Sequence, residues 1–524
     1  MALQKLCLIF PFLAAAVSAF KILIIQPSLS GSNIIYSSRV AETLAKAGHD
    51  VTLFRPDCHP KTKKLRSKLA KDLFVAGLNQ EKFMSVMSSG FSQVAFRDMG
   101  GSEFLQLLMQ FNEMNADACR AQVTDRKLMT KLRNERFDLA ITHMYDYCGF
   151  GIIRLAEIPT YIWMSSGLLH QHMAWAVGAP SPPSYVPNTE GRLSDTMTYL
   201  ERLENLMLLG VSAVVLPHLA KPMQQIFDEN YGPDFPDLVQ LSRESQLVFV
   251  NSDEMFDFPR PILHKTVYIG SLGMSEPPPL TEEWQKVVKE AESGVILFSL
   301  GSIVNTTLMP DGWTKSLLNT FSSHPSFTFL ISSDFEQLFD TEAKPKNVHL
   351  ATWIPQAELL SHSKVKLAIL HGGANGIMEA VLAGKPIVVI PLWGDQFYFA
   401  NLVEKRQVGV KLSKDQVESG ELSRAVETVL QDSKFKQNCE RMSRMIRKKP
   451  VKSEELLVKW VEFLAEFKTI PNLQPYANQL SLFQYFCLDV VAGLLGIVSL
   501  AVCVVFSCVR MLIRASLSPK PKSD

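Results

Sequence analysis

The residues best suited to do chemistry follow a buried, strand-like segment in the C-terminal half. The sequence His371-Gly-Gly-Ala-Asn-Gly376 comes directly after the apolar run 365–370. Closely spaced glycines let the backbone turn sharply into the next helix, which leaves the first N–H groups of that helix unpaired. These amides and the positive end of the helix dipole form an anion site. The pattern predicts a pyrophosphate site that needs neither a metal ion nor a phosphate-loop lysine.

Side chains next to this turn could bind the rest of a nucleotide. His371 and Asn375 could donate further hydrogen bonds. Asn375 and Glu379 are spaced i, i+4 and so project from one helix face near its N-terminus, where a carboxylate suits ribose hydroxyls. A glycine-rich turn before a helix is, by itself, more often plain topology than a phosphate site, and an exposed glutamate is usually only solvated. The constellation as a whole favours the nucleotide site.

The stretch from Trp353 to Gln396 extends this constellation with Trp353-Ile-Pro-Gln356 and Pro391-Leu-Trp-Gly-Asp-Gln396. It closely resembles the signature block of the UDP-glycosyltransferases, in particular the animal UDP-glucuronosyltransferases. The resemblance covers nearly the whole chain and implies an α/β protein with the GT-B fold, which has two Rossmann-like domains. The further segments that resemble the family are Ser184-Tyr-Val-Pro187, Phe258-Pro-Arg-Pro261, Val267-Tyr-Ile-Gly270 and Phe298-Ser-Leu-Gly-Ser302.

The resemblance implies a role for each matching donor-site residue. Trp353 would stack on uracil and Gln356 would hydrogen-bond it, as suits an aromatic plane and a two-ended amide. Glu379 would bind the ribose, and Asp395 and Gln396 would bind sugar hydroxyls. The residues that would form the phosphate turn are Ser302, His371, Gly372, Gly373, Asn375 and Gly376.

Two positions depart from the family within this half of the chain. Leu370 stands where the family usually has Thr, and Phe399 stands where many members have Asn. The resemblance therefore implies a UDP-sugar donor more firmly than a particular sugar. Arg260 is a candidate partner for a glucuronate carboxylate, with a capping or surface role as the alternative.

The acceptor side departs further from the family. In the family, a His in the first loop takes the acceptor proton and an Asp or Glu on a later strand orients it. The first loop here is Ser30-Gly-Ser-Asn33-Ile, so the His position matches Asn33, which cannot accept a proton at neutral pH. The position of the orienting acid matches His143, and Asp146 is nearby.

Three interpretations of these changes are open. His143 could itself be the base, oriented by Asp146 or Asn33. Alternatively, the acceptor is an amine or a readily ionised group, and stabilisation of the leaving group supplies most of the rate. In the third interpretation the chain binds a UDP-sugar and does no chemistry. The structural alternatives are that Asn33 turns the loop and that His143 is a hydrogen-bonded residue at a strand end.

The elements that must position these residues alternate between strands and helices in two halves. This alternation predicts doubly wound parallel sheets, which bind ligands outside the carboxyl ends of their strands. Helical stretches are expected through much of 61–136, and a loop-rich region with helical pieces at 167–240. Strands are expected at 21–26, 51–54, 138–142, 160–164, 247–250, 266–270, 295–299, 327–331, 348–351, 365–370 and 387–391, and helices at 40–47, 313–322, 356–361, 376–383 and 397–405.

The two ends of the chain predict membrane targeting. Residues 1–19 combine Lys5, an apolar run and a small-residue cleavage site, as a signal peptide does. Residues 490–509 are an apolar stretch of about 20 residues, the length that spans a bilayer as a helix. Basic residues follow, which places the tail in the cytosol and the rest in the lumen. The final Lys520-Pro-Lys522-Ser-Asp524 resembles a dilysine retrieval signal of the endoplasmic reticulum.

Composition narrows the function classes. The chain has 524 residues, enough for two domains, and 53 basic against 52 acidic residues give a formal charge of +1, which carries no signature of nucleic-acid binding. The eight cysteines show no zinc spacing and no disulfide framework, although one pair could form. Asn305-Thr-Thr307 is a sequon for N-glycosylation if it is exposed in the lumen.

The sequence therefore predicts a UDP-glycosyltransferase of the endoplasmic reticulum membrane. We expect it to transfer glucuronate or glucose from a UDP-sugar to a small lipophilic acceptor with inversion, with no cofactor beyond this co-substrate. The alternative is a catalytically silent UDP-sugar-binding protein or a partner subunit of active relatives, and either could form homo- or hetero-oligomers. The predicted segments are a signal peptide (1–19), an acceptor-binding domain (20–275), a linker (276–284), a UDP-sugar-binding domain (285–450), a helical segment packing back toward the first domain and the membrane (451–489), a transmembrane helix (490–509) and a cytosolic tail (510–524).

Overall fold

The structure is a computed structural model, which describes residues 19–27, 29–59, 62–98, 100–274, 277–301, 303–332, 335–336, 339, 344–351 and 353–517. Ser302, the dilysine signal and all but the last residue of the predicted signal peptide lie outside these residues. The chain forms two compact units, Met1–Leu473 and Gln474–Asp524, which are described separately.

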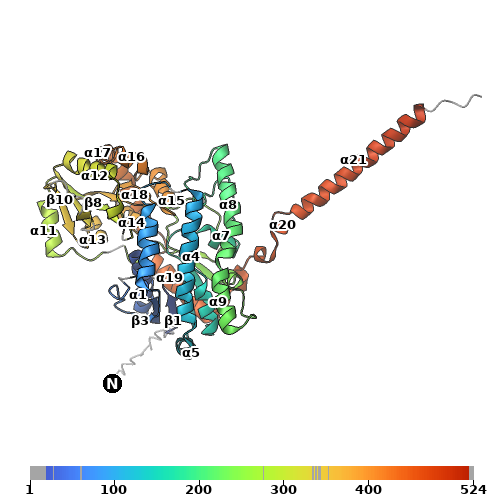
Figure 1. Ribbon diagram of the computed structural model, residues 1–524, viewed down its shortest axis with the longest axis horizontal. Coiled ribbons are helices and arrows are strands. Elements are labelled where there is room, and N and C mark those ends of the chain that lie inside the picture. Colours follow the sequence, from blue (N-terminus) through green and yellow to red (C-terminus); the bar gives the residue numbers. More distant parts are fainter. Residues whose placement is uncertain are drawn as a thin grey trace, which may run out of the picture. The chain divides into compact units, whose positions relative to one another are not determined.

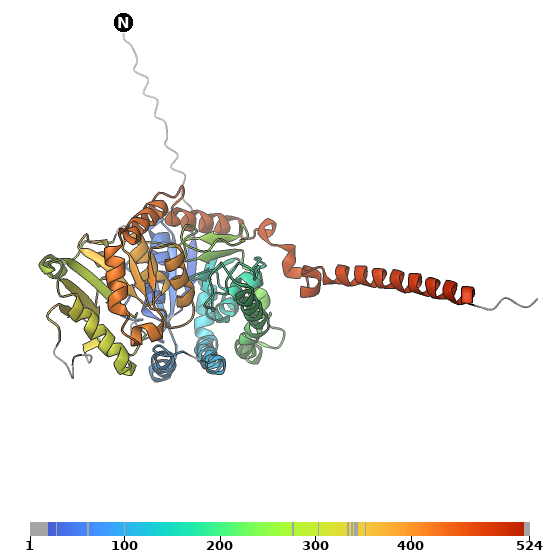
Figure 2. The ribbon, with the colours of Figure 1, turned by 90° about the horizontal axis from the view of Figure 1, so that it is seen from above.

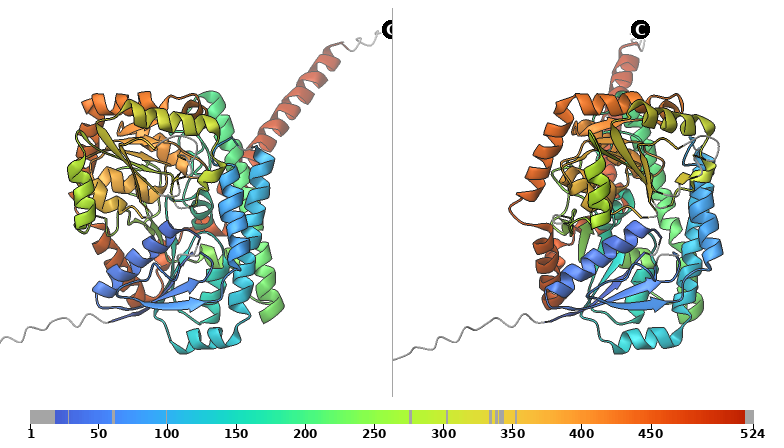
Figure 3. Two further views of the ribbon diagram at one scale, coloured as in Figure 1. Left: turned by 60° about the vertical axis from the view of Figure 1, so that its left-hand side comes forward. Right: turned by 90° about the vertical axis from the view of Figure 1, so that its left-hand side faces the viewer.

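The first unit contains two sheets in which all paired strands are parallel (Figures 1 and 3). In the described residues the first sheet has the order β3-β2-β1-β4-β5-β6-β7 and the second the order β10-β9-β8-β11-β12-β13. The strands of the first sheet are β1 (Lys21–Ile25), β2 (Asp50–Pro56), β3 (Lys71–Val75), β4 (Leu139–His143), β5 (Tyr161–Ser165), β6 (Leu247–Val250) and β7 (Thr266–Tyr268). Those of the second are β8 (Gly294–Ser299), β9 (Phe327–Ser332), β10 (Val348–Ala351), β11 (Val365–Leu370), β12 (Ile387–Val389) and β13 (Gly409–Lys411).

Helices connect these strands and cover both faces of each sheet (Figures 1 and 3). In the first half they are α1 (Gly31–Lys46), α2 (Gln80–Met84), α3 (Phe91–Gln93), α4 (Gly101–Val123), α5 (Arg126–Asn134), α6 (Cys148–Leu155), α7 (Gln171–Val177), α8 (Tyr199–Leu219), α9 (Lys221–Tyr231) and α10 (Leu238–Arg243). In the second half they are α11 (Glu282–Glu290), α12 (Asp311–Ser323), α13 (Gln356–Ser361), α14 (Ala374–Leu382), α15 (Gln396–Lys405), α16 (Lys414–Glu418), α17 (Leu422–Gln431) and α18 (Ser433–Arg447).

The central strands are largely apolar because both faces of each sheet are covered. β6, for example, is buried at all four residues, Leu247–Val250. One face of the first sheet packs against α1 and against α19 (Ser453–Phe467), a helix from the C-terminal end of this unit (Figure 2). The predicted domain boundaries are not tested by these contacts and stay a prediction.

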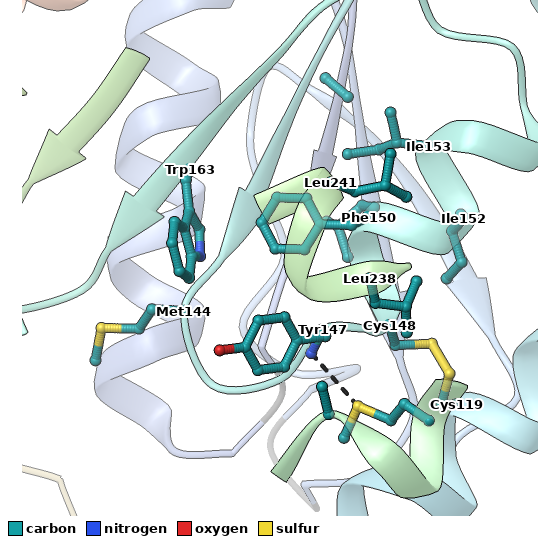
Figure 4. Packing of buried hydrophobic residues seen from close by; sticks show 14 of the residues in the cluster. Cys119, Met144, Tyr147, Cys148, Phe150, Ile152, Ile153, Trp163, Leu238 and Leu241 are labelled. Atoms are coloured by element: carbon teal, nitrogen blue, oxygen red, sulfur yellow. Dashed lines mark hydrogen bonds between the residues drawn. A yellow bond between two sulfur atoms is a disulfide. The ribbon is translucent and has the colours of Figure 1, made fainter. Parts of the chain in front are cut away.

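The opposite face of the first sheet packs against α4, α6 and α7. Trp163 from β5 contacts the rings of Tyr147 and Phe150 with centroid distances of 6.4 and 5.4 Å (Figure 4). A disulfide joins Cys119 of α4 to Cys148 of α6 beside this cluster (Figure 4). The cysteine spacing alone did not predict this pairing, because the two residues meet only through the packing of their helices.

The structure corrects several expectations in the first half. Helix α1 begins at Gly31 rather than near residue 40, because Ser30 caps it by accepting a hydrogen bond from the Asn33 N–H at 3.2 Å. Asn33 therefore lies in the first turn of a helix and not in a loop. The region 61–136, expected to be helical, also contains strand β3 at Lys71–Val75, and α8 is a 21-residue helix in the region expected to be loop-rich.

The second unit holds α20 (Leu482–Tyr485) and α21 (Leu488–Leu517). Within the described residues, α21 is long and apolar enough to cross a membrane. Its 30 residues would measure roughly 45 Å at the rise of an α-helix, which exceeds the hydrocarbon thickness of a bilayer. Its apolar side chains are exposed, for example at Leu500 and Phe506.

Candidate functional site

The order of the second sheet places its ligand-binding crevice at the ends of β8 and β11. The strand order reverses between these two neighbours, and open parallel sheets bind ligands beyond the carboxyl ends of the strands at such a switch point. Leu370 is in register with Ser299 of β8 and with Val389 of β12. The loops that follow these three strands therefore start at the same edge of the sheet.

The His371 ring is packed closely between two glycines of these loops. A Cβ atom on Gly301 would lie 2.9 Å from Nε2 of His371, and one on Gly373 would lie 2.6 Å from the same atom. Neither position has room for a side chain unless the ring moves. Burial lowers the pKa of His371 to about 4, although a hydrogen bond to the Ser299 backbone raises it, so at neutral pH the imidazole is uncharged and carries a single N–H.

The turn after His371 presents the start of helix α14. This helix begins at Ala374, two residues earlier than expected, and no side chain caps its N-terminus. Gly372 has a φ of +91°, a conformation that glycine adopts readily, and a Cβ there would lie 2.9 Å from the Gln396 carbonyl oxygen. The turn can therefore offer backbone amides and the helix dipole to an anion, as the sequence predicted.

Glu379 lies one turn further along α14 and is held by two donors. Nε2 of Gln356 donates to its Oε2 at 2.8 Å, and Nη2 of Arg39 lies 3.2 Å from its Oε1. The Gln356 amide also lies against the start of α14, because a Cβ on Gly376 would be 3.2 Å from Nε2. The predicted uracil and ribose residues thus lie side by side. Arg39, which comes from the first sheet's helix α1, was not predicted.

Trp353 and Asn375 occupy different surroundings. The Trp353 side chain is 55% exposed just before α13, so a stacked base could cover it. The Asn375 amide spans the two halves: Oδ1 accepts a hydrogen bond from Nδ2 of Asn251 at 3.0 Å, and Nδ2 donates to the Ser32 carbonyl at 3.4 Å. A phosphate would compete with Ser32 for this donor. Ser302 lies outside the described residues.

The loop before α15 carries Asp395 and Gln396. The side-chain oxygen Oε1 of Gln396 accepts hydrogen bonds from the Leu392 and Trp393 N–H groups, so this side chain shapes the loop and has only its Nε2 left for a sugar. Burial raises the pKa of Asp395 to about 6, although the charge of His170 lowers it. Asp395 lies close to His170 of the first half, because a Cβ on Gly167 would be 3.2 Å from Oδ2 of Asp395 and 3.8 Å from Nε2 of His170.

On the acceptor side, Asn33 belongs to a buried polar network. Its Oδ1 accepts a hydrogen bond from the Ser30 hydroxyl at 2.7 Å, and its Nδ2 donates to Tyr145 Oη at 3.0 Å and to Ser166 Oγ at 3.2 Å. The Tyr145 and Ser166 hydroxyls are 2.7 Å apart. The prediction that Asn33 orients His143 finds no support in these bonds, since none of them reaches His143.

His143 ends β4 and is 6% exposed. Its Nδ1 accepts a hydrogen bond from the Tyr145 N–H at 3.2 Å, so in the neutral ring the proton is on Nε2, which lies 3.6 Å from Asp146 Oδ2. Burial lowers the pKa of His143, although the charge of Asp146 raises it. His143 and Asp146 line a small pocket beside the disulfide.

Comparisons with known proteins identify the family. Residues 21–523 match the family model described as "UDP-glucoronosyl and UDP-glucosyl transferase". UDP-glucuronosyltransferase 1A7 of Rattus norvegicus is 30% identical, and the alignment covers 94% of this chain and 91% of the relative. This chain belongs to the UDP-glycosyltransferase family. It is a glycosyltransferase enzyme of the kind typified by the UDP-glucuronosyltransferases.

Other relatives and solved structures agree with this assignment. UDP-glucuronosyltransferase 1A7 of Mus musculus is 29% identical over 96% of this chain and 93% of its own. The solved glycosyltransferase of kitacinnamycin has a TM-score of 0.55 at 16% identity, over 86% of this chain and 99% of its own. CalG4, the calicheamicin glycosyltransferase, has a TM-score of 0.53 at 18% identity, over 85% and 98%. These likenesses confirm the GT-B fold of the glycosyltransferase.

Besides Arg39, three further residues of this glycosyltransferase lie at the candidate site but were not among the predicted site residues. They are Tyr145, His170 and Glu190, and Nδ1 of His170 lies 3.0 Å from Glu190 Oε1. No short motif contains His170 and Glu190, which are 20 residues apart and come together only in the fold. Arg260 donates to the Leu169 carbonyl and the Ser181 hydroxyl, which favours a structural role over a glucuronate partner. Within the described residues, no group of three or more His, Cys, Asp or Glu side chains could hold a metal ion.

Proposed function

We propose that the enzyme transfers a hexosyl unit, glucuronate or glucose, from its UDP-sugar to a small lipophilic acceptor, with inversion and without a metal ion. The observation that carries the proposal is the turn after β11, where the uncapped start of α14 lies beside a neutral His371 packed between Gly301 and Gly373. Donors fixed in this way can stabilise the charge that develops on the departing diphosphate without reorganising.

The resemblance to the family and the contacts of these side chains support the following roles for the donor residues. Trp353 covers the uracil, Gln356 hydrogen-bonds it, and Glu379 binds the ribose while Gln356 and Arg39 hold the carboxylate in place. Asp395 and the Gln396 amide bind hydroxyls of the sugar. A carboxylate has about four acceptor positions, so the two hydrogen bonds to Glu379 leave room for ribose hydroxyls.

Turnover tests this proposal directly. Purified full-length enzyme in lipid nanodiscs would be incubated separately with radiolabelled UDP-glucose and UDP-glucuronate and with a panel of phenols, alcohols and amines. We expect a labelled glycoside and an equal amount of UDP with at least one donor. An enzyme that binds UDP but forms no product from any acceptor would contradict the proposal.

A silent UDP-sugar-binding protein is the second candidate function. Two observations favour it: Asn33 replaces the family's base, and the basic nitrogen of His143 already accepts a backbone hydrogen bond. It predicts tight UDP binding together with zero product and zero hydrolysis of the donor in the experiment above.

We also propose that the enzyme is a single-pass protein of the endoplasmic reticulum membrane, with both sheets in the lumen. The exposed apolar length of α21 and the basic residues Arg510 and Arg514 near its C-terminal end support this orientation. Trypsin added to sealed microsomes should leave the unit ending at Leu473 intact until detergent is added. Digestion of this unit without detergent would contradict the lumenal orientation.

A further inference from the structure

A histidine and a carboxylate of the first half, next to the loop that carries Asp395, have been assigned no role above. Nδ1 of His170 lies 3.0 Å from Oε1 of Glu190. With Nδ1–H donating to the carboxylate, the lone pair is on Nε2, which is buried and has no hydrogen-bond partner in the structure. The His170 side chain is 93% buried, so its orientation is fixed by packing.

This free nitrogen faces the part of the donor site proposed to hold the sugar. A Cβ on Gly167 would lie 3.2 Å from Oδ2 of Asp395 and 3.8 Å from Nε2 of His170, so little more than the space of one methyl group separates the two side chains. A Cβ on Gly394 would lie 3.7 Å from Oε2 of Glu190. His170 and Glu190, here called the dyad, therefore lie against the loop that carries Asp395.

We propose that His170, oriented by Glu190, is the general base that deprotonates the acceptor in this enzyme. The inference rests on the proposed function. It places the base after β5, next to the loop that carries Asp395, instead of in the first turn of α1 or at the end of β4.

The proposed step removes one proton, forms one bond to the sugar and breaks one bond from the sugar to UDP. Nε2 takes the proton from the acceptor hydroxyl while the oxygen lone pair forms a bond to the anomeric carbon of the sugar. The bond from that carbon to the phosphate oxygen breaks, and its electron pair leaves with UDP. Glu190 stabilises the imidazolium that forms and holds Nε2 toward the acceptor. The imidazolium then releases its proton to solvent as the products leave.

His143 lacks this arrangement. Its Nδ1 accepts the Tyr145 N–H, and its Nε2 carries the proton in the neutral ring, so no lone pair is free to take a proton from an acceptor. In His170, Nδ1 is hydrogen-bonded to the Glu190 carboxylate, and Nε2 has no hydrogen-bond partner. This is the geometry required of a base and its orienting group.

Both residues of the dyad come from the first half, and residues of both halves hold the segments that carry them. His170 precedes α7, where Arg260 fixes the Leu169 carbonyl at 3.0 Å. The segment after Glu190 is fixed by Asn401 of α15, which donates to the Arg192 and Leu193 carbonyls at 3.0 and 2.9 Å. Nε2 of His170 and Oδ2 of Asp395 come from loops of the two halves, so an acceptor deprotonated by Nε2 would lie between these loops.

The charges around His170 set its pH dependence. Burial lowers the pKa of His170 and so does the charge of Arg260, but the hydrogen bond and charge of Glu190 and the charge of Asp395 outweigh them and raise it. His172, whose ring centroid is 5.8 Å away, is largely neutral because burial lowers its pKa to about 4. Activity should therefore rise with pH as His170 loses its proton.

The test uses full-length enzyme in nanodiscs, with benzyl alcohol and β-naphthol as acceptors and the donor that the wild type turns over. His170→Asn keeps a donor near the Nδ1 position and removes the base, so kcat should fall about 10²- to 10⁴-fold while the dissociation constant of UDP changes by less than about twofold. Glu190→Gln should move the rising limb of the pH–rate profile to lower pH, because it removes the carboxylate that raises the pKa of His170. His172→Gln, which keeps a donor for the Met144 carbonyl, is the matched control.

Each result bears on the inference. A kcat of His170→Asn within about threefold of wild type, or a limb that does not move in Glu190→Gln, would overturn it. A large loss in His143→Gln without a loss in His170→Asn would return the role to His143. If the wild type forms no product from any acceptor, the proposed function fails and this inference fails with it, whereas a retained turnover in His170→Asn overturns this inference alone.

Discussion

Two glycines determine where the His371 ring can lie. Gly301 and Gly373 leave space for the imidazole on two sides, and burial keeps the ring neutral by lowering its pKa to about 4. A neutral donor at fixed distance from the turn can serve a diphosphate without requiring a proton from solvent. The proposed donor function thus depends on Gly301 and Gly373, because a side chain at either position would displace the His371 ring.

Gly301→Ala tests this packing. The new methyl group would meet the His371 ring at 2.9 Å and displace it, so we expect the affinity for UDP to fall at least about tenfold, through the loss of a hydrogen bond to a charged group. Isothermal titration calorimetry measures the effect. Gly420→Ala is the matched control, because Gly420 has a similar φ of +90° but nothing within 4 Å of the added atom. Equal UDP affinities in the two variants would contradict the role of Gly301.

Buried neutral histidines predict acid sensitivity. Burial lowers the pKa of His371 and of His172 to about 4, below the ordinary 6.5, so between these values the unfolded chain binds protons that the folded chain does not. Stability is therefore lost as pH falls from about 6.5 to about 4, by roughly 3 kcal/mol for each group. The thermal midpoint of His371→Asn should fall less over this range than that of the wild type. Parallel curves would contradict the shift at His371.

Single residues of the donor site could be predicted because they are close in sequence and follow one strand. The turn at 371–376 and the acid Glu379 lie within a single β-strand and helix pair, so the sequence contains their geometry. His170 and Glu190 could not be found in this way. They come from separate loops, and their significance depends on a hydrogen bond and on a neighbour, Asp395, from the other half.

At the level of elements, helices α4 and α6 carry the only disulfide among the described residues. Cys119 and Cys148 close a loop with a sequence separation of 29 and join the helices that cover one face of the first sheet. Cys148 is also the first residue of α6, directly after the turn that contains Asp146. The crosslink therefore supports the wall of the pocket that His143 lines.

The variant Cys119→Ser with Cys148→Ser should lose about 3 kcal/mol of stability through the greater freedom of the unfolded chain. Thermal unfolding followed by tryptophan fluorescence would measure this loss. Reducing agent should lower the midpoint of the wild type and leave that of the double variant unchanged. A wild-type midpoint that does not respond to complete reduction would show that this crosslink contributes nothing to stability.

Elements were predictable where the apolar runs were long and were misjudged where the signals were short. The strands around the proposed donor turn, such as β12, are continuous apolar runs and were expected within a residue or two. Strand β3, with the sequence Lys-Asp-Leu-Phe-Val, is a partly exposed edge strand and has no such run. The start of α1 was missed because its cap is one serine in a run of small polar residues.

On the scale of the whole molecule, groups from the first half contact residues of the proposed donor site. Arg39 of α1 reaches Glu379, and Asn251 reaches Asn375. Lys414 of α16 donates to the Val94 and Arg97 carbonyls at 2.7 Å, which fixes another part of the first half to the second. The affinity for the donor therefore depends on how the two halves meet.

Arg39→Ala tests this dependence. Removing the guanidinium leaves Glu379 with a single donor, Gln356, and removes a contact between the halves, so we expect UDP to bind roughly three- to tenfold more weakly, as for the loss of one charge-assisted interaction. Arg424→Ala on α17 is the control, since this arginine is exposed and belongs to the second half. Unchanged affinity in Arg39→Ala would mean that the second half binds the donor alone.

The central claim is that UDP binds where the chain turns after Leu370, with Trp353 over its base. Hydrogen–deuterium exchange of the full-length enzyme, with and without UDP, tests it most directly. The account predicts slower exchange of the amides from Gly372 to Ile377 together with a change in Trp353 fluorescence, and neither change in Gly301→Ala at the same UDP concentration. Protection elsewhere in the molecule, with exchange at this turn unchanged, would contradict it.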